Sequence, residues 1–267
     1  MKRTSLIGLI LAFFALPVVP QEVSPTEAFL KTVRNRDVDA VRSALAADPS
    51  LADAKSTRGN SATLVALTVV GPNDEGISGF YPPKANAVLQ AILARKPRFE
   101  LVETAALGNG RELEAMLRAT PNAVSQYDRT GWTLLHIAAF AGNVETTRLL
   151  IGKGADVNAR ARSKWRNTPL QTAVLTGAYE TAKLLLENGA DPLVRQAQGV
   201  APMHEAARHA RADLVQLLLD HGAELNSRMD DGKTPLAWAI ESHRDQLVAL
   251  LKSKGAVAGD TFPPYVD

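Results

Sequence analysis

Residues 131–159 read GWTLLHIAAFAGNVETTRLLIGKGADVNA, and parts of this stretch return along the chain at a fixed distance. Pro169, Pro202 and Pro235 each open a similar segment, and their positions differ by 202 − 169 = 33 and 235 − 202 = 33. The Gly-Ala pairs that begin at positions 189, 222 and 255 keep the same spacing. A constant period of this length is typical of repeat proteins, in which every unit is one small group of helices or strands.

Each unit predicts two short helices. The residues after Thr168 are mostly small and apolar, Gly177 interrupts them, and a second helix ends in the leucines at 184–186. Threonine caps a helix through its hydroxyl, proline suits the first helical turn, and glycine tolerates the left-handed backbone after a helix. These backbone roles assign structural tasks to Thr168, Pro169, Pro202, Thr234 and Pro235.

A unit of this length with T-P-L-H, then A-A, a glycine, L-L-L and G-A-D-V-N resembles the ankyrin repeat. Good copies cover 131–256, and weaker ones extend upstream, where Ala105-Ala106 precede Ala138-Ala139 by one full period. The resemblance implies an all-α solenoid of stacked helix-turn-helix units with short β-hairpin connections. We expect about seven units over 26–257, the first three degenerate, followed by a tail at 258–267.

His136 stands alone in an apolar stretch and could be an active-site base or part of the framework. It shares its repeat position with His204, and the resemblance implies that this imidazole hydrogen-bonds to backbone near the turn. His221 falls in a helix ending and is expected to be structural as well. His209 and His243 have no evident repeat role and are expected to be solvated helix residues, although histidine is generally a frequent catalytic group.

The search for catalytic motifs finds no zinc-binding H-E-x-x-H pair, no nucleophile elbow and no phosphate-binding loop in the sequence. The chain contains no cysteine, which excludes disulfides, thiol catalysis and thiolate metal sites. We therefore predict a protein that is not an enzyme, with no catalytic residues, no metal, no cofactor and no small-molecule substrate.

The first residues, MKRTSLIGLILAFFALPVVPQE, carry two positive charges followed by an apolar run, the pattern of a secretory signal peptide. We assign residues 1–20 to this signal and expect a periplasmic or secreted protein. No clear cleavage site precedes Gln21. The alternatives are an uncleaved membrane anchor and a buried first helix.

The second unit contains an insertion. Leu64 aligns with Leu134 at an offset of 70 and Leu93 with Leu150 at an offset of 57, and the difference, 70 − 57 = 13, is the length added within 71–84. Glycine and proline favour a loop there between the two helices of the unit. Phe80 and Tyr81 either anchor a partner at its tip or fold back onto the helices.

Two changes affect the connections between units. Leu93 and Leu117 lie closer together than one period, since 117 − 93 = 24, so a hairpin is expected to be missing after Arg98. The connection at 158–167 is instead longer than usual by two positions. It gathers one aromatic and four basic side chains: Arg160, Arg162, Lys164, Trp165 and Arg166. These residues could bind an acidic partner surface or phosphates, or form a solvated turn.

The concave face of such a stack is lined by hairpins and first helices. Carrying the family positions over, the resemblance places a mixed apolar and charged set there: Ile137, Phe140, Leu175, Trp238, Arg208, His209 and Glu241. An apolar patch rimmed by charge suits a protein partner. Some of these residues could instead pack between units.

The charge balance favours neither nucleic acid nor lipid. The formal charge is +2, and without the segment 1–20 the 30 − 2 = 28 basic residues are balanced by 28 acidic ones. We expect an exported, monomeric protein that binds another protein, as a periplasmic scaffold or stabiliser. The alternatives are a secreted effector that binds a target-cell protein and a polyanion or nucleic-acid binder acting through Arg160–Arg166.

Overall fold

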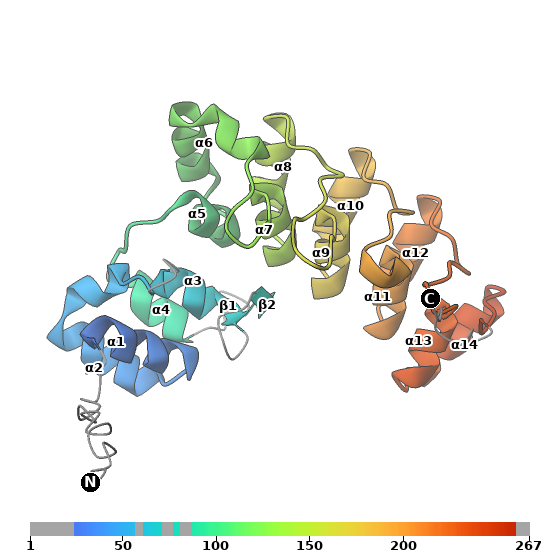
Figure 1. Cartoon of the computed structure of the whole chain (residues 1–267), viewed down its shortest axis with the longest axis horizontal. Helices are drawn as coiled ribbons and strands as arrows, with labels where there is room; N and C mark the ends of the chain where they lie inside the picture. Colours follow the sequence, from blue (N-terminus) through green and yellow to red (C-terminus); the bar gives the residue numbers. More distant parts are fainter. Residues whose placement is uncertain (1–23, 57–60, 71–76, 81–86, 260–267) are drawn as a thin grey trace, which may run out of the picture.

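The computed structural model describes residues 24–56, 61–70, 77–80 and 87–259, and α-helices dominate this part of the chain (Figure 1). Fourteen helices lie in the described ranges, in consecutive pairs. The pairs are α1 (Pro25–Arg34) with α2 (Val38–Ala47), α3 (Ala62–Leu67) with α4 (Ala87–Leu93), α5 (Leu101–Leu107) with α6 (Gly110–Ala119), α7 (Leu134–Ala141) with α8 (Val144–Gly152), α9 (Pro169–Thr176) with α10 (Tyr179–Glu187), α11 (Pro202–Arg208) with α12 (Ala212–Asp220), and α13 (Pro235–Glu241) with α14 (Asp245–Ser253).

The pairs stack side by side into an arc (Figure 1). The first helices α5, α7, α9, α11 and α13 pack against one another in order. The second helices α6, α8, α10 and α12 form a parallel row behind them. Because each unit contacts its neighbours, stability is shared between repeats and the interfaces that join them. The all-α solenoid predicted from the sequence is confirmed.

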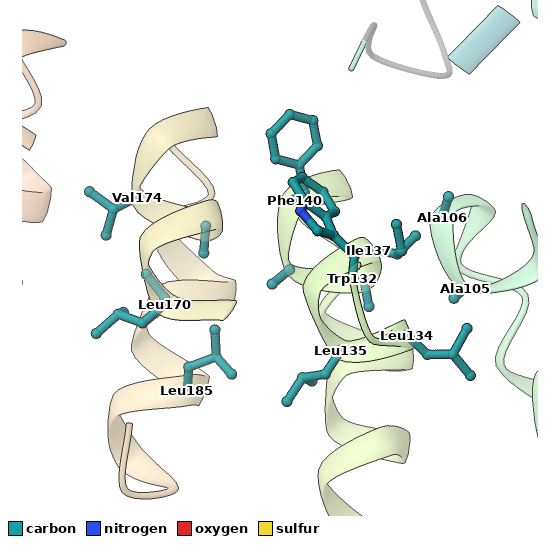
Figure 2. Close-up of a cluster of buried hydrophobic side chains, with 14 of the residues drawn as sticks. Ala105, Ala106, Trp132, Leu134, Leu135, Ile137, Phe140, Leu170, Val174 and Leu185 are labelled. Atoms are coloured by element: carbon teal, nitrogen blue, oxygen red, sulfur yellow. The ribbon is translucent and has the colours of Figure 1, made fainter. Parts of the chain in front are cut away.

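Buried leucines fill the space between the two rows (Figure 2). Leu135, Leu150, Leu170 and Leu185 are fully buried, at positions that recur along the repeats. Small residues on the neighbouring first helices, such as Ala105 and Ala106 on α5, are buried with them. Alanine at these positions lets adjacent helices approach closely, so the core is a continuous layer running along the stack.

Helix ends use the residues that the repeat supplies. The hydroxyl of Thr168 accepts a hydrogen bond from the backbone N–H of Gln171 at 3.4 Å, and Thr234 does the same for Ala237 at 3.3 Å. Pro169, Pro202 and Pro235 stand in the first turns of α9, α11 and α13. Ala201 replaces threonine before α11, which has no side-chain cap.

The connections between units are turns that bond to one another. The N–H of Arg162 donates to the Gly131 carbonyl at 2.8 Å, and the N–H of Ala197 donates to the Trp165 carbonyl at 2.9 Å. A third bond, 3.0 Å long, joins the N–H of Asp230 to the carbonyl of Gln198. Short 3-10 segments occur in several connections: η1 (Pro49–Asp53), η3 (Pro121–Ser125) and η4 (Ala197–Gly199). The turns therefore form a continuous row beside the first helices.

The second unit departs from the others. Two short antiparallel strands, β1 (Thr68–Val70) and β2 (Ile77–Phe80), occupy described parts of the region between α3 and α4. The predicted insertion does lie between these helices, but the prediction of a loop missed the strands. Strand formation there depends on the pairing of Thr68 with Phe80 across the insertion, which no local pattern specifies.

The expected loss of a hairpin after Arg98 is confirmed for the described residues. A short connection, 94–100, joins α4 directly to α5. The N–H of Arg98 donates to the Asp53 carboxylate at 2.6 Å, and Lys55 forms an ion pair with Glu100. The first two units are thus tied to the third through side chains of the earlier turn.

Gly131 tests how tightly neighbouring turns fit. Its φ is +82°, and a Cβ there would lie 2.9 Å from the carbonyl carbon of Arg162. We expect Gly131→Ala to lower the free energy of unfolding by about 2 kcal/mol or more, because left-handed strain adds to a backbone clash. Gly154→Ala is the control, since Gly154 has a φ of +86° and open space around it. Chemical denaturation should show a loss of only about 1 kcal/mol there; equal losses would contradict the close packing.

Candidate partner-binding surface

His136 belongs to the framework of the stack. Its side chain is fully buried, and Nε2–H donates to the Asn167 carbonyl of the next turn at 3.0 Å. Nδ1 lies 2.8 Å from the Thr133 hydroxyl and accepts from the Thr133 N–H at 3.3 Å. Burial lowers the pKa of His136 from 6.5 to about 4. A neutral imidazole with both nitrogens occupied joins two units and has no access to a substrate.

The same position in other units carries different side chains with the same task. His204 Nε2–H donates to the Lys233 carbonyl at 3.1 Å, and burial lowers its pKa as well. Gln171 accepts from the Thr168 N–H at 2.9 Å and donates to the Val200 carbonyl at 3.0 Å. A glutamine that forms equivalent bonds shows that the imidazole acts here as a hydrogen-bonding bridge.

The remaining histidines lie at or after the ends of helices. His243 lies in the turn between α13 and α14 with a φ of 53°, so it is exposed but not helical. His209 follows the last residue of α11 as its C-cap, so it is also exposed but not helical, and its Nε2 lies 3.6 Å from the Glu205 carboxylate. His221 is the C-cap that follows α12, and its Nδ1 lies 2.9 Å from the Leu217 carbonyl, in agreement with a structural role.

The basic turn at 158–167 is longer than the turns of the following units. The N–H of Ala161 donates to the Asn167 carbonyl at 2.8 Å, enclosing five residues, whereas the corresponding bond from Gln196 to Val200 encloses three. The extension of this turn by two positions is therefore confirmed. Trp165 is 50% exposed, which makes it one of the few large apolar side chains that face solvent in the described part of the chain.

All four cations of this turn, which we call the basic hairpin (residues 160–166), are exposed. The Arg162 guanidinium lies over the Tyr127 ring, 4.0 Å from its centroid, and Lys164 lies 5.1 Å from the Trp165 ring centroid. Arg160 donates to the Arg195 carbonyl at 3.0 Å. Among the described residues, none of the four forms an ion pair with a carboxylate.

Ile137 and Phe140 do not lie on the concave surface as predicted. Ile137 is fully buried and Phe140 is 3% exposed. Ile137 points from α7 toward α5, where the small Ala106 leaves room for it (Figure 2). The Trp132 ring packs edge-on against Phe140 with centroids 5.1 Å apart. Trp132 thus helps to bury Phe140, and Ile137 is buried against an alanine that the repeat itself supplies.

The later units expose more of the predicted face. Leu175 and Trp238 are half-buried, and Arg208 is exposed with its guanidinium 5.5 Å from the Trp238 centroid. Exposed Glu241 forms an ion pair of 3.1 Å with Lys233, and its hydrogen bond raises the pKa of Lys233. Arg208 of α11 thus contacts Trp238 of α13, whereas Leu175 lies on α9.

Sequence reasoning missed that Arg160 starts a row of arginines. Arg195 donates to the Arg228 carbonyl, just as Arg160 donates to that of Arg195. The signal was present, because the positions of these arginines differ by 195 − 160 = 35 and 228 − 195 = 33, like the repeats themselves. Arg195, however, also forms an ion pair of 3.4 Å with Asp230.

The inserted segment contributes less than expected to a definable site. The backbone of Phe80 ends strand β2, and Tyr81 lies outside the described residues. Their role as partner contacts stays a prediction.

Hollows on the described surface are small or lack converging reactive groups. One of about 120 Å³ is lined by residues such as Tyr127, Trp132 and Leu134, below the roughly 300–1,000 Å³ of most ligand sites. A groove of about 390 Å³ beside α14 includes His243 and Arg244. The described residues contain no group of three His, Cys, Asp or Glu that could hold a metal ion.

Comparison with known proteins agrees with this architecture. A sequence profile described as "Ankyrin repeats (3 copies)" matches residues 99–196 and 192–261. The chain is also similar to Ankyrin repeat domain-containing protein 13B from Mus musculus and from Homo sapiens, each 45% identical over 64 residues. These matches cover 24% of this chain and 10% of each relative, so the chain spans about a tenth of their length. Ankyrin repeats generally mediate protein–protein interactions and are generally non-enzymatic binding modules. With more than half of its residues matched by the family profile, the chain belongs to the ankyrin-repeat family.

Proposed function

We propose that this protein is an exported binding protein that holds a partner protein on its row of turns and first helices, as a periplasmic scaffold or stabiliser. The observation that carries the proposal is Trp165, half exposed among four cations that no described carboxylate pairs, on a turn bonded to both neighbouring units. Exposed aromatic residues on rigid supports are effective anchors for protein partners. Binding at this surface needs no enclosed cleft.

Export rests on the N-terminal sequence. Residues 1–20 have the charge and apolar run of a signal peptide but lie outside the described residues. None of the described helices is long and apolar enough to cross a membrane. Fractionation of the producing cells tests this part: recovery with the periplasmic proteins supports the scaffold, and recovery in the medium supports a secreted effector.

Binding can be tested separately by photo-crosslinking in living cells. A photoreactive amino acid at position 165 should capture a defined protein, because Trp165 lies at the exposed end of the basic hairpin. The same group at position 148, an exposed arginine on α8, is the control and should capture none of it. The same photoreactive group at position 80 tests whether the inserted segment contacts the partner. Equal capture from 165 and 148 would contradict binding by the turns.

A further inference from the structure

We infer that the basic hairpin (residues 160–166) recognises an acidic segment of a partner protein, with carboxylates paired to its cations and an apolar side chain covering Trp165. This inference rests on the proposed function and specifies the chemistry of the partner. It concerns a turn whose positive charges no carboxylate in the described part of the chain compensates.

The backbone of the basic hairpin is held on both sides. Arg162 donates to the preceding turn and the Trp165 carbonyl accepts from the following one. Asn158 at its base bridges to the next unit, accepting from the Asp191 N–H at 2.8 Å and donating to the Gly189 carbonyl at 3.0 Å. A supported turn loses little conformational entropy on binding, so its exposed side chains are already placed for a partner.

Burial alternates along the first strand-like part of this turn. Ala159 and Ala161 are 6% and 3% exposed, whereas Arg160 and Arg162 face solvent. Arg160 is held by the Arg195 carbonyl and Arg162 by the Tyr127 ring. Each contact fixes part of a guanidinium without neutralising its charge. A fixed, charged guanidinium can form two parallel hydrogen bonds with one carboxylate.

Trp165 adds an apolar contact to this charge. Its ring is half exposed and has Lys164 beside it. An exposed aromatic ring beside a cation suits a ligand that offers both an apolar group and negative charge, because the ring supplies affinity and the charge selects the ligand. A peptide with acidic and aliphatic residues meets both requirements.

The extent of the positive charge favours a protein segment over nucleic acid. In the following turns Arg195 is paired with Asp230, and Lys233 is paired with Glu241 and Asp231. A nucleic-acid strand running along the row of turns would therefore meet carboxylates after the basic hairpin. Nucleic-acid binding generally uses a basic surface that follows several successive phosphates, whereas a short acidic segment needs only the length of one turn.

The test measures binding of fluorescein-labelled synthetic probes to the purified chain by fluorescence anisotropy. The main probe is a short peptide of glutamate and aspartate interrupted by two leucines, and its control replaces every acid with the corresponding amide. The acidic peptide should bind, and its binding should weaken as salt is raised. The amide peptide should bind at least about tenfold more weakly.

Matched variants test whether the acidic peptide binds at the basic hairpin. Arg162→Glu and Trp165→Ala should each weaken binding of the acidic peptide by about tenfold or more. Arg148→Glu reverses an exposed charge on α8, behind the row of first helices, and should leave binding within about twofold.

The results that would overturn the inference are equal binding of the acidic and amide peptides, no binding of either, or tighter binding of an oligothymidylate probe than of the acidic peptide. Capture of a protein from position 165 in cells together with any of these results would leave the proposed function standing and remove only the acidic chemistry. If the acidic peptide does not bind and position 165 captures no protein in cells, the proposed function is contradicted as well.

Discussion

His136→Ala is expected to lower the free energy of unfolding by about 3 kcal/mol at neutral pH, because it leaves a cavity and buried polar groups without partners. The Asn167 carbonyl and the Thr133 N–H would both lose their hydrogen bonds. His136→Gln should retain most of the stability, since Gln171 forms the corresponding bonds one unit later. Urea denaturation of the three proteins measures the difference.

The same position predicts a pH dependence. The pKa of His136 is about 4 in the folded chain, below its ordinary value of 6.5, so the unfolded chain takes up a proton first as the pH falls. The stabilisation is complete above pH 6.5 and is lost between 6.5 and 4, by about 3 kcal/mol in total. His204, whose pKa is also lowered, acts in the same direction.

His136→Gln should flatten this pH dependence because glutamine does not titrate. The pKa of Asp213 is lowered by its hydrogen bond from Arg211, and that contribution is lost only near and below its ordinary value of 3.8, outside the histidine range. The difference between the pH profiles of the parent chain and His136→Gln therefore isolates the contribution of His136. An unchanged slope in the glutamine variant would show that His136 is not a buried neutral bridge.

Leu170→Ala is the second large effect, with an expected loss of about 2–5 kcal/mol. Leu170 is fully buried on α9 (Figure 2), between units that both depend on this interface. Leu175 lies on the same helix but is only half-buried, so Leu175→Ala should cost about 1 kcal/mol or less. Thermal and urea unfolding of both variants provide the comparison.

Comparing Leu170→Ala with Leu175→Ala distinguishes a residue of the stacked core from a residue of the surface. Since the core is a continuous layer along the repeats, the cavity at Leu170 weakens the contacts of α9 with α7 and α11. Similar losses for the two variants would mean that Leu175 is part of the core and is not available to a partner.

The sequence predicted the repeated features well, because each has a local backbone reason. The spacing of the prolines located the first helices, and the two extra positions at 158–167 located the longer turn. The structural task of His136 was implied by the resemblance to the ankyrin repeat. Such features depend only on residues within one unit or on the constant geometry between units.

The failures concern contacts between particular neighbours. Ile137 and Phe140 were placed on the concave face but are buried, since Phe140 packs against Trp132 and Ile137 points toward Ala106 of the preceding unit. The strands β1 and β2 depend on pairing across an insertion. The arginine row was readable from the spacing of Arg160 and Arg195, but its hydrogen bonds to successive carbonyls were not.

The most direct test of binding by the turns is capture of the partner in cells by the double variant Trp165→Ala with Arg162→Glu, measured beside its melting temperature. Both side chains face solvent, away from the buried layer between units. We predict that chemical crosslinking no longer captures the partner while the melting temperature stays within about 2 °C of the parent. Undiminished capture by a normally folded double variant would contradict a partner-binding surface at this turn.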